Sequence, residues 1–125
     1  MAGWSIDELS VIDRTDELRL RSMRADGSLR DPVTMWVVRN GDDLYVRPVK
    51  GRSGWYQGTR SRRQGQIASG GVTKDVTFVD ADGDPALNAA LDQAYRSKYA
   101  SYADSIVGHV TNDQARGATL KLQPR

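Results

Sequence analysis

A segment in the middle of the chain combines cations, a hydroxyl and glycine in the way that phosphate binding requires. Arg47, Lys50 and Arg52 supply three positive charges, and Ser53 adds a hydroxyl. A phosphate is held by charge-assisted donors together with backbone N–H groups. Gly51 lets the backbone approach a ligand closely, because glycine has no side chain. These five residues predict a pocket for a negatively charged group.

Trp55 and Tyr56 follow this segment directly. Their rings are suited to stacking on a flat ligand ring, either an isoalloxazine or a nucleotide base. We therefore include both residues in the predicted binding site. The alternative is that both pack in the core, because Trp and Tyr are usually mostly buried. The segment is not a Walker loop, since the Gly-Lys-Ser/Thr ending is missing.

Positive charge is concentrated around this segment, although the whole chain carries a net charge of only +2. No acidic residue lies between Asp43 and Asp75, and this interval holds seven cations: Arg47, Lys50, Arg52, Arg60, Arg62, Arg63 and Lys74. Such a block creates a local positive field and predicts an anionic partner. The alternative is a set of solvated surface cations. A nucleic-acid site on Arg60, Arg62 and Arg63 is disfavoured by the nearly neutral total charge.

The residue inventory excludes several other kinds of site. The chain has no cysteine, which excludes a disulfide framework, a thiolate metal site and a cysteine nucleophile. His109 is the only histidine, so a multi-histidine metal site is excluded too. We expect His109 to lie at a helix end or on the surface rather than in a catalytic site. No targeting segment or membrane-spanning run is visible, and we expect a cytoplasmic protein.

The elements that must position the cationic segment are mostly short strands. Alternating polar and apolar residues predict strands at 17–24, 32–39, 44–47, 64–69, 72–79 and 118–122. The stretch 51–58 is typical of a glycine-rich loop. Asn40 and Gly41 are typical of a type I′ hairpin turn, because both accept a positive φ.

Two helices have clear start signals. Ser5 and Glu8 form a capping-box pattern before a short helix at 6–11. Asp84 and Pro85 suit the N-cap and first position of a longer helix at 86–99. A further helical piece is expected at 102–110. The chain is thus predicted to be one mainly β domain, residues 1–125, whose antiparallel strands close into a small barrel with flanking helices.

Several runs of the sequence together resemble one bacterial protein family. They are 33–38 (VTMWVV), 40–47 (NGDDLYVR), 51–56 (GRSGWY), 66–78, 94–99 (AYRSKY) and 118–122 (ATLKL). On these runs the chain is identified as a member of the domain of unknown function 2255 family. This family is similar to a branch of the FMN-binding split-barrel superfamily, which includes pyridoxamine-phosphate oxidases and deazaflavin-dependent nitroreductases. The resemblance implies a six-stranded antiparallel split barrel and a homodimer with a cofactor, FMN or a deazaflavin, at the subunit interface.

The resemblance also bears on the turn before the second strand. Deazaflavin-dependent relatives carry a Gly-Arg-Lys-Ser-Gly stretch there, which holds phosphate. The corresponding turn here, residues 24–30, lacks the lysine and contains Asp26; Arg24 and Arg30 replace the lysine only in part. If the protein is an enzyme, the resemblance implies a flavin- or deazaflavin-dependent oxidoreductase. The alternatives are a cofactor-free interaction or ligand-sensing domain and, less favoured, a small nucleic-acid-binding barrel.

Overall fold

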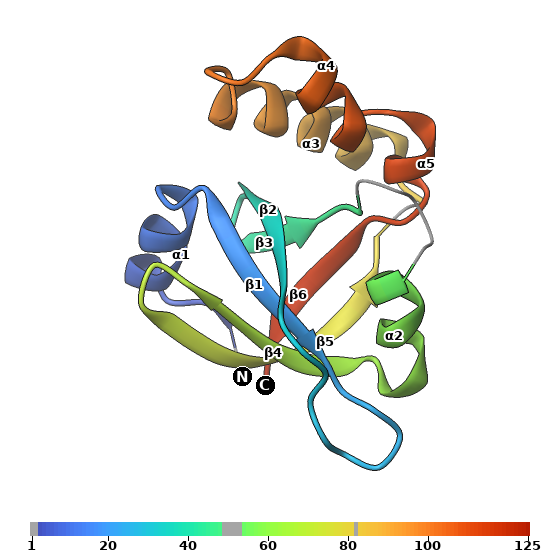
Figure 1. The fold of residues 1–125 in the computed structure, drawn as a ribbon. Coiled ribbons are helices and arrows are strands. Elements are labelled where there is room, and N and C mark those ends of the chain that lie inside the picture. The colour runs from blue at the N-terminus through green and yellow to red at the C-terminus, as the bar shows by residue number, and fades with distance from the viewer. Residues whose placement is uncertain (1–2, 49–53, 82) are drawn as a thin grey trace.

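Alternating apolar residues build a closed antiparallel barrel of six strands, as the sequence and its family resemblance predict (Figure 1). The computed structural model describes residues 3–48, 54–81 and 83–125. The strands are β1 (Glu17–Ser22), β2 (Val33–Asn40), β3 (Asp43–Val46), β4 (Gln64–Ser69), β5 (Val72–Asp80) and β6 (Leu120–Pro124). Their order around the barrel is β1-β2-β3-β6-β5-β4, and β4 pairs with β1 to close it.

Strand periodicity places one side of each strand inside the barrel. On β1, Leu18, Leu20 and Ser22 are buried, whereas Arg19 between them is exposed. Leu20 lies opposite Val33 of β2 on one side and Ile67 of β4 on the other. The interior is filled by the apolar side chains Leu18, Leu20, Met35, Val37, Leu44, Val46, Ile67, Val76, Phe78, Leu120 and Leu122. Burial of this apolar surface is the main stabilising contribution to the barrel.

The two tight hairpins differ in their turn geometry. Between β4 and β5, Gly70 and Gly71 both have positive φ, as in a type I′ turn. Between β2 and β3, Asn40 still pairs with Asp43, so the two central residues of the turn are Gly41 and Asp42. Gly41 alone has a positive φ there, as in a type II′ turn. The prediction of a type I′ turn at Asn40 and Gly41 is therefore wrong, because the ladder extends one pair further.

Helix α1 (Ile6–Asp13) covers one end of the barrel (Figure 1). Its predicted capping box is present: Glu8 N–H donates to Ser5 Oγ, and Ser5 N–H donates to Glu8 Oε1. Leu9 and Ile12 are fully buried in the barrel core. The helix thus closes this end with apolar side chains.

A layer of helices covers the outer face of β2 and β3. It consists of α3 (Pro85–Lys98), α4 (Asp104–Val107), a 3₁₀ helix (Gly108–Val110) and α5 (Asp113–Arg116). The Asp84 side chain caps α3 as predicted. A second apolar cluster joins this layer to the barrel; its members are Val38, Tyr45, Leu91, Tyr95, Tyr99, Val107 and Val110. Among the helices in the described ranges, none is long and apolar enough to cross a membrane.

Helix α2 (Gly54–Arg62) occupies part of the predicted glycine-rich loop at 51–58. The loop prediction is wrong from Gly54 onward, although this stretch has weak intrinsic helix propensity. Packing explains the difference, because Tyr56 inserts into the barrel core and Arg30 Nη1 donates to the Gly58 carbonyl. Tertiary contacts therefore stabilise a helix that local propensity does not favour.

Candidate functional site

Arg47, the first predicted phosphate ligand, is 1% exposed, and its guanidinium group donates to acceptors inside the protein. Its Nε donates to Thr119 Oγ1 at 3.0 Å. One terminal nitrogen donates to Asp92 Oδ1 at 2.5 Å and to the Val110 carbonyl, and the other to the carbonyl and side-chain oxygens of Asn88. These acceptors account for all five N–H groups of the guanidinium. The structure corrects the prediction: Arg47 is a buried structural residue with no donor left for a phosphate.

Asp92 lies at the centre of this polar cluster. Its second oxygen accepts from Arg116 Nε at 2.9 Å and Nη2 at 2.7 Å. Burial raises the pKa of Asp92, but hydrogen bonds from Arg116 and Arg47 outweigh it, so the pKa is lowered overall. The ionised carboxylate thus joins α3 to the end of β3 and to α5. This is a structural role, because a buried charge must be paired.

Tyr56, predicted to stack on a ligand ring, packs among the core residues of the barrel and is 5% exposed. Its hydroxyl accepts from Arg60 Nη1 at 3.3 Å, and the Arg60 guanidinium carbon lies 5.4 Å from the centre of its ring. The alternative of core packing therefore holds for Tyr56. Trp55 lies on α2, but its side chain is outside the described part of the structure. The other predicted ligands, Lys50, Gly51, Arg52 and Ser53, lie outside the described residues too.

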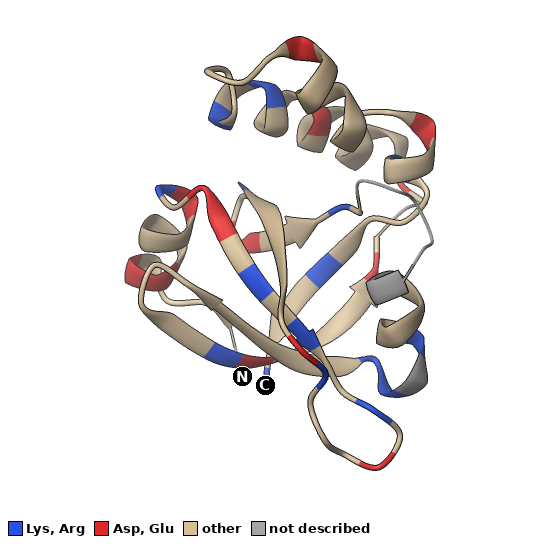
Figure 2. Ribbon diagram, viewed as in Figure 1, with Lys and Arg blue, Asp and Glu red and all other residues tan. Residues whose placement is uncertain are grey.

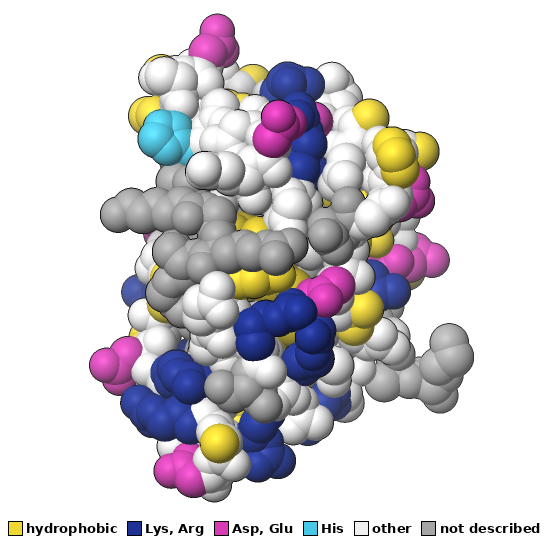
Figure 3. Space-filling view, turned by 90° about the vertical axis from the view of Figure 1, so that its right-hand side faces the viewer, with side chains coloured by type: hydrophobic (Ala, Val, Ile, Leu, Met, Phe, Trp, Pro, Cys, Tyr) yellow, Lys and Arg dark blue, Asp and Glu magenta, His cyan; other side chains and the backbone are white. Residues whose placement is uncertain are grey.

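Two cationic segments that are distant in sequence meet on one face of the barrel. Arg62, at the end of α2, donates from Nη1 to the Ala25 carbonyl in the loop between β1 and β2 at 3.2 Å. Arg24, in the same loop, donates to Ser28 Oγ and to the Leu29 carbonyl. Figure 2 shows Lys and Arg along β1, this loop and α2. Figure 3 shows Lys and Arg side chains gathered over the lower part of this side of the molecule. We call the surface that carries Arg24 and Arg62 the cationic face.

Arg30 fixes the position of α2 on this face. Its Nη1 donates to the carbonyls of Met23 at 3.0 Å and Gly58 at 3.2 Å, and to Ser22 Oγ at 3.4 Å. Gly58 allows this close approach, because a Cβ there would lie 2.8 Å from Ser22 Oγ. Arg30 therefore acts mainly as a bridge between α2 and β1, and Arg24 and Arg62 present their guanidinium groups to solvent.

Asp26 accepts hydrogen bonds from both donors of Ser28 in this loop. Its Oδ1 accepts from the Ser28 amide at 2.9 Å and from the Ser28 hydroxyl at 2.7 Å. These hydrogen bonds, the hydroxyl first, lower the pKa of Asp26. An anionic ligand here would therefore rely on Arg24 and Arg62 rather than on Ser28.

The other side of α2 carries a second group of charges. Arg60 donates to both carboxylate oxygens of Asp80, and Arg63 donates to one of them. Both arginines belong to the cationic block of the sequence, but nothing in the sequence pairs them with Asp80. The order of charges along the chain does not show that the end of β5 lies beside the end of α2.

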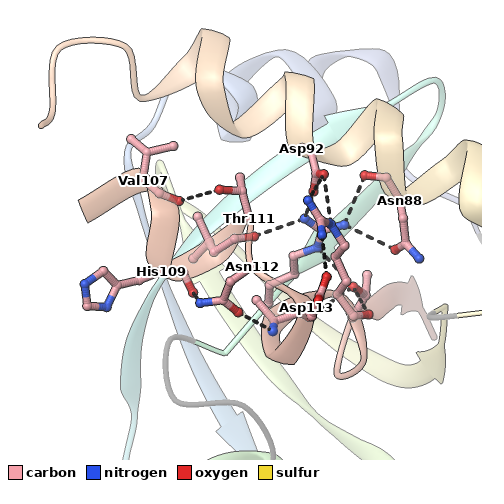
Figure 4. Close-up of polar contacts among 12 residues, drawn as sticks. Asn88, Asp92, Val107, His109, Thr111, Asn112 and Asp113 are labelled. Carbon is pink, nitrogen blue, oxygen red and sulfur yellow. Dashed lines mark hydrogen bonds and ion pairs between the residues drawn. The ribbon is translucent and has the colours of Figure 1, made fainter. Parts of the chain in front are cut away.

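His109 belongs to the 3₁₀ helix of the helical layer and to neither of the two arginine groups around α2. Its ring is exposed and points away from the polar cluster around Asp92 (Figure 4). Its backbone carbonyl accepts from the Asn112 side chain. In the described ranges, no three His, Asp or Glu side chains are arranged to hold a metal ion. A hollow of about 400 Å³ lies elsewhere, between the N-terminal segment, the β2–β3 turn and β6, lined by Trp4, Ile6, Asp42, Asp43 and Lys121 among others.

Several solved structures share this fold at low sequence identity. The heme storage protein HutZ from Vibrio cholerae is 14% identical with a TM-score of 0.59, over 93% of this chain and 86% of that one. An F420 reductase is 13% identical with a TM-score of 0.54, over 93% of this chain and 90% of that one. The conserved hypothetical protein Rv2991 from Mycobacterium tuberculosis is 13% identical with a TM-score of 0.59, over 99% of this chain and 81% of that one.

No curated protein matches the sequence. A family model does match, over residues 8–122, which is nearly the whole chain. The family is described as an uncharacterized protein conserved in bacteria. The match agrees with the sequence runs identified above and with the six-stranded barrel. The chain therefore belongs to the family DUF2255, with the split-barrel architecture that the similar structures share.

Proposed function

We propose that this protein binds a phosphate-bearing flavin or deazaflavin, and that Arg24 and Arg62 hold its phosphate. The observation that carries the proposal is the meeting of the β1–β2 loop with the end of α2, where Arg62 contacts Ala25. Two exposed guanidinium groups from separate segments are a donor set that matches the oxygen atoms of a phosphate. The phosphate end of such a cofactor therefore fits the residues present.

The ring end of the cofactor is supported less directly. Tyr56 does not fit the role, because its side chain is enclosed by the barrel core. Trp55, Lys50, Gly51, Arg52 and Ser53 stay as predicted contacts. In the sequence they stand directly before α2 and at its start.

The comparisons are in keeping with a small-molecule cofactor. Proteins with this fold include one named for heme storage and one named an F420 reductase. F420 is a deazaflavin, and such a cofactor supplies hydride chemistry when it is bound. The residues of this chain would bind and orient it, so no separate acid–base pair is needed for an oxidoreductase.

The test is a titration of the purified protein with FMN, FAD and F420, followed by ligand fluorescence at fixed ionic strength. Arg24→Gln and Arg62→Gln should each weaken binding about tenfold, since a charge-assisted hydrogen bond contributes roughly 1.5 kcal/mol. Arg96→Gln is the matched control, because Arg96 is exposed on α3. It should bind like the wild type.

Absence of binding for all three ligands at high micromolar concentration would overturn the proposal and favour the cofactor-free interaction domain. Equal binding by the wild type, Arg24→Gln and Arg62→Gln would show that Arg24 and Arg62 do not hold the phosphate. Native mass spectrometry of freshly purified protein measures a retained ligand and the subunit number together. It thus also tests the predicted homodimer.

A further inference from the structure

Arg60 and Arg63 hold Asp80 in the way that arginines hold a ligand. Arg60 makes two parallel contacts, Nη1 to Oδ1 at 2.5 Å and Nη2 to Oδ2 at 3.2 Å. Arg63 Nη1 adds a third contact to Oδ2 at 3.2 Å. A fork of this kind matches a carboxylate and a phosphate equally well.

The backbone of Arg63 gives a second, independent observation. Arg63 has a φ of +55°, and it is the one non-glycine residue in the described ranges with a positive φ. It follows the last residue of α2, where its N–H donates to the Thr59 carbonyl and its carbonyl accepts from Phe78 N–H. Helices usually place glycine at such a left-handed end, because a side chain there is strained.

The Arg63–Asp80 ion pair does not explain why arginine stands at this position. The two side chains are 47% and 40% exposed, and ion pairs that exposed contribute little to stability. Glycine would relieve the backbone strain and cost only this weak pair. Stability therefore does not favour arginine at position 63, whereas a requirement for its charge does.

We infer that Arg60 and Arg63 form a second anion-binding site, which Asp80 occupies as an internal substitute for a ligand phosphate. Hydrogen bonds, the one from Arg60 first, lower the pKa of Asp80, so it is an anion at neutral pH. A phosphate dianion carries more charge and more acceptor oxygens than a carboxylate. It therefore competes with Asp80, whose half-exposed side chain can turn to solvent.

This site is distinct from the proposed cofactor contacts, because Arg62 turns to the β1–β2 loop whereas Arg60 and Arg63 turn to β5. It takes phosphate or a phosphate monoester. Asp80 competes with the ligand for the two arginines and so lowers the affinity of the site for phosphate. The wild type therefore binds phosphate weakly and fills this site only at higher phosphate concentration.

The test is a titration with inorganic phosphate followed by ³¹P NMR at constant ionic strength. Asp80→Asn should tighten phosphate binding about threefold or more, because it removes the competing charge. Asp75→Asn, an exposed carboxylate on the same strand, is the matched control and should change nothing. Arg63→Gly should weaken binding about threefold or more while its Tm stays equal to or above that of the wild type.

Wild-type affinity in both Asp80→Asn and Arg63→Gly would overturn the inference and leave a simple surface ion pair. If Asp80→Asn does not fold, Arg63→Gly decides alone, because glycine suits that backbone conformation. Failure of the cofactor proposal would appear separately, as FMN binding that Arg24→Gln and Arg62→Gln leave unchanged. Such a result has no bearing on the gain expected from Asp80→Asn.

Discussion

The Arg47 guanidinium and the Asp92 carboxylate meet at 2.5 Å in the interface between the barrel and its helical layer. The Arg47 side chain is fully buried and that of Asp92 is 9% exposed. The pair therefore fixes α3 on the end of β3 by a charge contact that water does not screen. Arg47, which the sequence suggests as a phosphate ligand, thus has a structural role.

Replacing one partner of this pair should destabilise the protein strongly. In Arg47→Gln, Asp92 keeps Arg116 but loses its buried partner, and we expect a loss of about 3 kcal/mol in the free energy of unfolding. Urea denaturation followed by circular dichroism measures it. Arg96→Gln, on the exposed side of α3, should stay within about 0.5 kcal/mol of the wild type. A similarly small change in Arg47→Gln would show that the pair is dispensable.

Tyr95 on α3 and Tyr99, the residue directly after this helix, should respond differently to removal of the hydroxyl. Tyr99 Oη accepts from the Val37 amide at 3.0 Å and donates to the Asp16 carbonyl at 2.6 Å. Tyr99→Phe leaves these groups without their partner and should cost about 1–3 kcal/mol. Tyr95 Oη is buried and has no hydrogen-bond partner among the described residues, so Tyr95→Phe should be neutral or stabilising. Thermal unfolding of the two variants beside the wild type tests the contrast.

Acid should weaken the fold through carboxylates whose native pKa is lowered. Burial raises the pKa of Asp92, but hydrogen bonds from Arg116 and Arg47 outweigh this effect, so the pKa is lowered overall. The hydrogen bond from Arg60 lowers the pKa of Asp80. Such groups stabilise the native state above their unfolded pKa of about 3.9, and this stability is lost as pH falls below it. Urea midpoints between pH 7 and pH 2.5 should fall steeply below about pH 4. The fall should be shallower in Asp92→Asn, which starts from a lower stability.

Lys98 should make the protein more stable in mild alkali than at neutral pH. Its Nζ donates to the carbonyls of Ile12 and Val37, and burial lowers its pKa to about 8 despite nearby carboxylates. In the unfolded chain its pKa is about 10.4. Between these values the unfolded state binds more protons, so the free energy of unfolding rises with pH. Lys98→Met should flatten this rise between pH 8 and pH 10, measured by urea denaturation.

Above about pH 10 the trend should reverse. Burial raises the pKa of Tyr95 and Tyr99 above the ordinary value, so the native state keeps protons that the unfolded state releases. Their stabilising contribution is lost as pH rises further. Lys98→Met should keep this decline, which separates the effect of the tyrosines from that of the lysine.

Local signals in the sequence were enough for most of the fold. Ser5 and Glu8, and Asp84 before α3, cap helices by contacts within three residues of each other, so a short window contains all the information. The strands follow from period-two alternation, with ends within about two residues of those observed. Helix α2 was not predictable in this way, because the contact that stabilises it is between Tyr56 and a distant core.

The partner of Arg47 was out of reach for the same reason, since Asp92 lies 45 residues further along the chain. One signal was nevertheless present. Asn88 and Asp92 stand four residues apart, beside the apolar stripe of Leu87, Leu91 and Tyr95 on α3. Polar groups at the edge of a buried helix face call for a buried partner, and Arg47 ends the apolar run of β3.

The strand order has a consequence for how the chain is made. β6 lies between β3 and β5 in the barrel, yet it follows all five other strands in chain order. Until Leu120 and the residues after it have left the ribosome, β3 and β5 each present an unpaired edge that invites pairing with other chains. A chain cut short before β6 should therefore aggregate, even though the other five strands of the barrel and the helices seen in the described ranges have been translated.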